Sequence, residues 1–144
     1  MFTSNFEKRI GVDRISKDNY YLGIARAVSM RSTCLRRQYG AIIVKNDRIV
    51  STGYNGAAIG EPNCCDVGQC WREMNNIPHG ERYEECVAVH AEANAIIQAS
   101  AEELEGATLY LYGREDGSSV FRAEPCKMCA RMIKNAKIAK VISL

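Results

Sequence analysis

Two short segments of the sequence bring together residues that could hold a metal ion and move protons. His90 and Glu92 stand two residues apart in VHAEANAI, and Cys126 and Cys129 stand three apart in PCKMC. Residues three apart share one face of a helix, so both thiols can reach one ion from a first helical turn. Residues two apart point about 200° from each other, so His90 and Glu92 can converge only beyond the first turn of a helix. If the two helix starts meet, an imidazole and two thiolates surround one point.

One nitrogen and two sulfurs are the ligand count of a catalytic zinc, which keeps its fourth position open to water. H-x-E followed by P-C-x-x-C is also the signature of zinc-dependent nucleobase deaminases, in which the glutamate is a general acid and base and not a ligand. We therefore expect His90, Cys126 and Cys129 to hold Zn2+ and Glu92 to move protons. A redox cysteine pair and a closed structural zinc with one further cysteine are the alternatives.

The elements that would position these residues follow from the pattern of apolar residues and caps. Pro125 suits the first turn of a helix, and Asn46-Asp47 suits a tight turn between two strands. Strands alternating with helices predict an α/β sandwich. In chain order, we expect a helix begun by Ser16 or Asp18, the hairpin GAIIVKNDRIVSTG, an irregular stretch over about 53–86, a helix ending near Gly106, the strand ATLYLY, a polar loop GREDGSSVFRAE, the helix PCKMCARMIKNA and the strand AKVISL.

Length and composition predict a single soluble domain over residues 1–144. Charged residues make up 25% and apolar residues 47%, and the net charge of +2 is too small to indicate nucleic acid or a membrane as partner. The leading MFTSNFEKRI lacks the apolar core of a signal peptide, so we expect a cytoplasmic protein. In such a protein seven cysteines favour metal binding or catalysis over disulfides.

HAEANAI, PCKMC, GYNG and RSTC together resemble the deoxycytidylate (dCMP) deaminase branch of the cytidine/deoxycytidylate deaminase family, over roughly Asp18 to Leu144. The resemblance implies a three-layer α/β/α cytidine-deaminase-like sandwich with a mixed central sheet. It implies hydrolysis of dCMP to dUMP and ammonia, which supplies the precursor of thymidylate. It also implies a homo-oligomer, commonly a hexamer. The loop GYNGAAIGEPNC departs from the family at Ala58-Ile59, so the sequence leaves regulation by dCTP and dTTP open.

The resemblance also assigns substrate contacts. Asn55 matches the asparagine that contacts the sugar, although a turn between glycines would explain it too. The backbone N–H of Ala91 would hold the pyrimidine carbonyl, and the backbone carbonyl of Glu124 would accept from the exocyclic amine. Tyr112 or Phe121 would pack on the base, with plain core packing as the alternative. Phosphate needs cationic or hydroxyl donors, for which the segment RSTCLRRQ offers Arg31, Ser32, Thr33, Arg36 and Arg37.

The cysteines of the long irregular stretch suggest a second metal site. Some dCMP deaminases carry a structural zinc whose cysteines match Cys34 and Cys64, and here Cys70 and Cys86 could complete it, with Cys65 or His79 as substitutes. Such a site would keep a 30-residue loop ordered, since metal binding supplies folding free energy. Reduced, half-buried thiols are the alternative.

Three other functions fit part of the pattern. A tRNA adenosine deaminase shares HAE and PCxxC, but would be expected to carry a stronger basic surface. A free-cytidine deaminase usually has cysteine where His90 stands. A non-catalytic zinc scaffold would have no use for an unligated Glu92 beside the metal. The sequence does not separate dCMP from dCTP or a modified deoxycytidylate as substrate.

Overall fold

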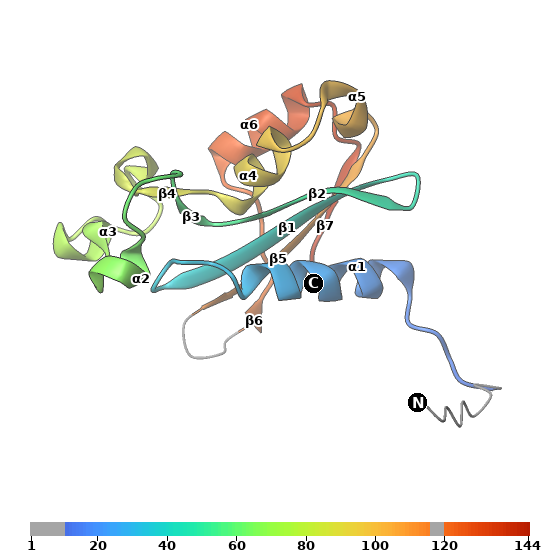
Figure 1. The fold of residues 1–144 in the computed structure, drawn as a ribbon, viewed down its shortest axis with the longest axis horizontal. Coiled ribbons are helices and arrows are strands. Elements are labelled where there is room, and N and C mark those ends of the chain that lie inside the picture. Colours follow the sequence, from blue (N-terminus) through green and yellow to red (C-terminus); the bar gives the residue numbers. More distant parts are fainter. Residues whose placement is uncertain (1–10, 116–119) are drawn as a thin grey trace, which may run out of the picture.

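A mixed β-sheet forms the middle layer of the computed structural model, which describes residues 11–115 and 120–144 (Figure 1). In that part of the chain the sheet has five strands, in the order β2–β1–β5, and both β6 and β7 pair with β5. β1 is antiparallel to β2 and β5, whereas β7 is parallel to β5, which confirms the mixed sheet. The strands are β1 (Arg37–Lys45), β2 (Arg48–Tyr54), β5 (Thr108–Glu115), β6 (Val120–Phe121) and β7 (Lys140–Ile142).

One face of the sheet is covered by α1 (Lys17–Ser29). The Ser16 hydroxyl accepts a hydrogen bond from the Asn19 N–H at 3.1 Å, which satisfies a free donor of the first turn and confirms the predicted cap. The Tyr110 hydroxyl of β5 donates to Asp18 at 2.7 Å. The apolar stripe of α1 forms one buried cluster with alternate residues of β1 and β5: Tyr21, Leu22, Ala25, Ile42, Val44, Tyr110 and Tyr112.

The opposite face is covered by α4 (Ala91–Ile97), α5 (Ala101–Leu104) and α6 (Lys127–Asn135), which completes the three layers (Figure 1). Residues one position along from the α1 cluster form the second core, because side chains of a strand alternate between its faces. Fully burying one such aliphatic side chain stabilises the fold by about 1.5–3 kcal/mol. The cluster contains Ala41, Ile43, Leu109 and Leu111 from the sheet and Ala91, Ala95, Leu104, Ala107, Ala123, Ile133 and Ile138 around it.

The predicted hairpin is confirmed, with its turn at Asn46 and Asp47. Both residues have positive φ, 52° and 60°, as a two-residue type I′ turn requires. β1 begins at Arg37 and not at Gly40, because Arg37 to Tyr39 pair with the extended end of β5. That end of β5 replaces part of the predicted polar loop.

The helix predicted to run to Gly106 is two helices. α4 ends at Ile97, and α5 begins after Ser100, whose hydroxyl accepts from the Glu103 N–H while the Glu103 carboxylate accepts from the Ser100 N–H. This reciprocal capping box starts a new helix in the middle of the predicted one. At α6 the cap is Cys126, one residue after Pro125.

The long irregular stretch contains short elements of its own. Within it β3 pairs with β4 through Gly56–Val89 and Ala57–Ala88, so the ends of the stretch are joined. The Cys65 N–H donates to the Thr33 carbonyl at 3.2 Å, which ties it to the segment before β1. Its elements are β3 (Gly56–Ala57), α2 (Cys64–Val67), α3 (Trp71–Met74), the 3₁₀ turn η1 (Tyr83–Glu85) and β4 (Ala88–Val89).

Two predictions fall partly outside the described residues, namely the leading segment 1–10 and positions 116–119 of the polar loop. Within the described residues, every helix is too short or too polar to cross a lipid bilayer.

Candidate active site

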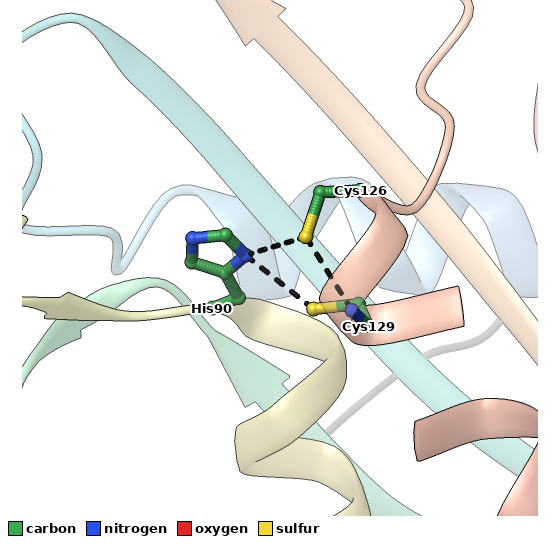
Figure 2. A group of neighbouring side chains, drawn as sticks. All are labelled: His90, Cys126 and Cys129. Carbon is green, nitrogen blue, oxygen red and sulfur yellow. Dashed lines mark hydrogen bonds between the residues drawn. The ribbon is translucent and has the colours of Figure 1, made fainter. Parts of the chain in front are cut away.

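The starts of α4 and α6 lie side by side, and each is capped by a predicted metal ligand. His90 is the N-cap residue of α4, and Cys126 is that of α6 (Figure 2). Figure 2 shows the imidazole directed toward both thiols of the α6 start. The two motifs, 36 positions apart in the chain, therefore meet as their chemistry requires.

α4 is held in this place by β2, beneath it. Gly53 permits close packing, because a Cβ there would lie 2.4 Å from both the Ala91 carbonyl oxygen and the Ala95 nitrogen. The Ser51 hydroxyl donates to the Ala95 carbonyl at 2.7 Å, and the Asn94 amide donates to the Tyr54 carbonyl at 2.8 Å. The backbone that carries the histidine is thus fixed on the sheet.

The three ligand atoms have the spacing of a zinc site. His90 Nδ1 lies 3.5 Å from Cys126 Sγ and 3.4 Å from Cys129 Sγ. Zinc–nitrogen and zinc–sulfur bonds at a tetrahedral angle place N and S about 3.6 Å apart. All the ligand atoms of His90, Cys126 and Cys129 lie within 4.8 Å of one another, and among the described residues these three form the group of side chains close enough to share a metal ion. The donor set therefore fits Zn2+ without rearrangement.

Glu92 is the second residue of α4 and is buried, with 4% of its surface exposed. It lines the same pocket as His90 and Cys126. Burial raises the pKa of the Glu92 carboxyl above its usual range, while its own backbone N–H, His90 and Cys129 act in the opposite direction. A carboxyl that accepts a proton more readily than one in water suits general acid and base catalysis.

The pocket has a volume of about 360 Å³, which suits a small organic ligand. One part of its wall is formed by His90, Glu92 and Cys126. The remainder combines arginines and aromatic side chains with cysteines and a few other residues: Arg36, Arg37, Arg72, Arg122, Tyr39, Tyr83, Phe121, Cys34, Cys70, Cys86, His79, Asn55, Glu124 and Ala88.

Asn55 and Arg37, two of the predicted substrate contacts, line this pocket and support one another. The Asn55 side chain is buried, accepts from the Tyr39 N–H at 2.9 Å and donates to the Arg37 carbonyl at 2.9 Å. The Arg37 guanidinium lies 5.4 Å from the Phe121 ring centroid and pairs with Glu115 at 3.0 Å. Both ends of the Asn55 amide therefore brace the start of β1.

The other predicted contacts occupy different positions. Ser32 and Thr33 both bond the Asn55 carbonyl, through a hydroxyl at 3.1 Å and an N–H at 3.2 Å, so they support the pocket and do not line it. Arg31 is exposed and also lies outside the pocket lining. Ala91 is fully buried as the first residue of α4.

Tyr112 is not placed where the prediction put it. It packs with Tyr110 and α1 on the opposite face of the sheet, because alternation along β5 directs both rings to that side. Of the two aromatic candidates, Phe121 lines the pocket.

Three of the predicted second-zinc cysteines, Cys34, Cys70 and Cys86, line the same pocket. Burial raises the pKa of the Cys64 thiol, and the nearby thiols of Cys34, Cys70, Cys86 and Cys65 raise it further. In the described chain these cysteines are more loosely spaced than the 4.8 Å that unites the His90 group. All seven cysteines are free thiols.

The pocket wall also contains residues that were not predicted from the sequence: Arg72, Tyr83, Tyr39 and Arg122. Arg72 and Tyr83 belong to the irregular stretch, where no periodicity indicates which side chains turn inward. Tyr39 and Arg122 lie next to residues that were predicted. Tyr39 is bonded through its N–H to Asn55, and Arg122 follows Phe121 in the chain.

The chain is similar in sequence and structure to known proteins. Residues 15–144 match the family model for the cytidine and deoxycytidylate deaminase zinc-binding region. The chain is 40% identical over 130 residues to a deoxycytidylate deaminase of Mycobacterium phage D29, covering 87% of this chain and 91% of the relative. It is 32% identical over 130 residues to a deoxycytidylate deaminase of Schizosaccharomyces pombe, covering 90% of this chain but 37% of that longer protein. The structure of a cyanophage S-TIM5 dCMP deaminase in complex with dCMP and dUMP is similar with a TM-score of 0.62 and 28% identity, over 89% of this chain and 82% of that one.

Proposed function

The chain belongs to the cytidine and deoxycytidylate deaminase family, and from that premise we propose that it hydrolyses dCMP to dUMP and ammonia. One observation carries the proposal: His90, Cys126 and Cys129 converge at zinc spacing beside a buried carboxyl, Glu92, in a pocket of nucleotide size. Two relatives that share this domain are deoxycytidylate deaminases.

His90, Cys126 and Cys129 would hold Zn2+ and leave its fourth position open. When bound, zinc lowers the pKa of a water molecule to about 7 and so supplies a nucleophile at neutral pH. Glu92 takes a proton from the attacking water and delivers it to N3 of the cytosine ring. The same carboxylate then takes the proton of the hydroxyl added at C4 and delivers it to the amine, so that ammonia leaves as the C4 carbonyl forms; its raised pKa favours this double use.

The start of α4 and the pocket wall offer groups to orient the nucleotide. The Ala91 N–H would hold the pyrimidine carbonyl, and the Glu124 carbonyl would accept from the exocyclic amine. Phe121, which lines the pocket, would pack on the base. Asn55 would meet the sugar, and Arg37 would meet the phosphate by exchanging part of its ion pair with Glu115.

We propose a second, structural zinc on Cys34, Cys64, Cys70 and Cys86. Its support is the position of Cys34, Cys70 and Cys86 in one pocket wall, together with the effect of the neighbouring thiols on the pKa of Cys64. A metal there would hold the short elements between β3 and β4 together. Metal analysis of the purified protein should find about two zinc ions per chain, and a firm value of one would refute this site.

The hexamer, the effectors dCTP and dTTP, and the cytoplasmic location stay predictions from the family resemblance. Light scattering tests the oligomer. Assays with and without each effector test regulation, and a fluorescent fusion in the native host tests location.

The function itself is tested by ammonia release from dCMP, CMP, dCTP, deoxycytidine and a tRNA anticodon stem-loop. We expect dCMP to have the highest kcat/KM, since Arg37 in the pocket wall suits a monophosphate. A preference for deoxycytidine or for the stem-loop would refute the proposal. The Glu92→Gln protein is the matched control, because it separates the chain's own activity from a contaminant.

A further inference from the structure

The cavity wall contains a buried cation that the proposed chemistry does not use. Arg72 is 6% exposed in α3, and none of the salt bridges of the described residues involves it. A buried guanidinium without a carboxylate partner is costly unless its N–H groups are bonded. The environment of Arg72 therefore indicates a specific role for this side chain.

Its N–H groups hold the turn that precedes η1. Nη1 donates to the Arg82 carbonyl at 2.8 Å, and Nη2 donates to the Pro78 carbonyl at 2.9 Å. Arg82 has a φ of 46°, a left-handed conformation that is unfavourable for a residue with a Cβ. The planar fork of arginine thus holds two carbonyls of a strained turn with two separate nitrogens, a geometry that the single ammonium nitrogen of lysine does not reproduce.

The same guanidinium lies against Tyr83, the residue after that turn. The distance from its Cζ to the ring centroid is 5.2 Å, within the range of a cation–π contact. Tyr83 in turn meets the His90 imidazole at 6.0 Å between centroids and an interplanar angle of 82°, the edge-to-face geometry that aromatic pairs prefer. A contiguous chain of contacts therefore joins Arg72 to a metal ligand.

His90 needs such a support. A metal-bound histidine is usually oriented by a hydrogen bond from its second ring nitrogen. Here Nδ1 faces the two thiols and Nε2 points away from them (Figure 2), and the hydrogen bonds found among the described residues engage only Nδ1. The flank of the ring is held by Tyr83 instead.

We propose that Tyr83 is a positioning residue for the zinc-ligating imidazole and that Arg72 acts through it. The inference rests on the proposed metal site. It assigns the irregular stretch a part in the chemistry, because α3 and η1 together fix the orientation of one ligand of the ion. Tyr83 supplies an aromatic surface and not a proton, so its hydroxyl is dispensable for this role.

The test measures zinc binding and not turnover. Zinc affinity is determined by competition with a chromophoric chelator for the full-length wild type, Tyr83→Leu, Tyr83→Phe, Arg72→Lys and the Tyr83→Leu/Arg72→Lys double variant. We expect Tyr83→Leu and Arg72→Lys each to weaken affinity by about 10-fold or more, as supporting residues of metal ligands do. Tyr83→Phe should stay within about twofold of wild type, by the aromatic-pair argument. The visible spectrum of the Co2+ form should shift in the Leu variant and not in the Phe variant.

The double variant decides whether the two residues act in series. If Arg72 acts through Tyr83, adding Arg72→Lys to the Tyr83→Leu protein should weaken its zinc affinity by less than about a further twofold. Full additivity, or a Tyr83→Leu protein that binds zinc as tightly as wild type, overturns the inference. So does an Arg72→Lys protein that changes only the KM for dCMP, since that assigns Arg72 to the substrate.

Folding and metal binding are separated by controls. Circular dichroism and melting temperature are measured for each apo protein, and if Arg72→Lys does not fold, the comparison of Tyr83→Leu with Tyr83→Phe carries the test. A wild-type protein that binds no zinc refutes the metal site and this inference with it. If the wild-type and Tyr83→Leu proteins both bind zinc with equal affinity, this inference alone is refuted.

Discussion

Replacing Gly53 by alanine should disable the site by displacing α4, without changing any side chain of the pocket wall. The added Cβ would lie 2.4 Å from the Ala91 oxygen and the Ala95 nitrogen, whereas ordinary contacts of this kind begin near 3.4 Å. α4 must therefore move about 1 Å away from β2, since both contacts are with backbone and no side chain can turn aside. That displacement shifts His90 and Glu92 relative to Cys126.

Two effects of this displacement can be estimated. Overpacking of this kind typically costs about 1–3 kcal/mol of stability. A shift of about 1 Å in catalytic groups can lower turnover by about 100-fold even when the mutation is remote from the chemistry. The assay is kcat for dCMP at saturating zinc, together with the melting temperature and zinc affinity of the same preparation.

Gly40→Ala is the matched control for this prediction. A Cβ at Gly40 would lie 2.1 Å from the Ala25 oxygen and 2.5 Å from the Ser29 nitrogen, so it displaces α1 on the opposite face. α1 contributes no residue to the pocket lining. The control should lower stability at least as much but lower kcat of the folded fraction far less. A Gly53→Ala protein with kcat and zinc affinity within twofold of wild type would contradict the reasoning, because α4 would then not depend on β2 for its position.

Three further predictions follow from single side chains. Glu92→Gln should retain zinc in metal analysis but lose about 10²–10⁴ in kcat, the usual range for a general acid and base, and full activity would remove Glu92 from the mechanism. Cys86→Ser should lower the melting temperature and the zinc content by one ion per chain, and an unchanged melting temperature would count against the second site. The Tyr21 hydroxyl donates to Asp47, and this bond together with burial raises the pKa of Tyr21 from 10.0 to about 12. The folded chain then keeps a proton that the unfolded chain loses, so stability should fall as pH rises from about 10 to about 12, and Tyr21→Phe should flatten that fall in urea titrations.

The metal residues could be predicted from the sequence because their signals are local. His90 with Glu92, and Cys126 with Cys129, each fit within one helical turn, and the cap at Ser16 is equally local. The break after α4 also had a local signal, since Ser100 and Glu103 form an S-x-x-E box. The helical spacing of the apolar residues around it concealed that box.

The remaining pocket residues depend on packing between distant segments. Arg72 and Tyr83 face the pocket only because short elements fold over the end of the sheet, and no repeat in the sequence encodes that path. Tyr112 is a different case. Alternation with Tyr110 along β5 would have assigned it to the α1 face, but no sequence signal had yet identified that face.

The most direct test of the account is a crystal structure of the zinc-loaded protein with data collected at the zinc absorption edge. We expect an ion bound by His90 Nδ1 at about 2.0–2.1 Å and by the Cys126 and Cys129 sulfurs at about 2.3 Å, with the Glu92 carboxylate outside bonding distance. A carboxylate oxygen of Glu92 bonded to the ion, or no zinc between these three residues, would contradict it.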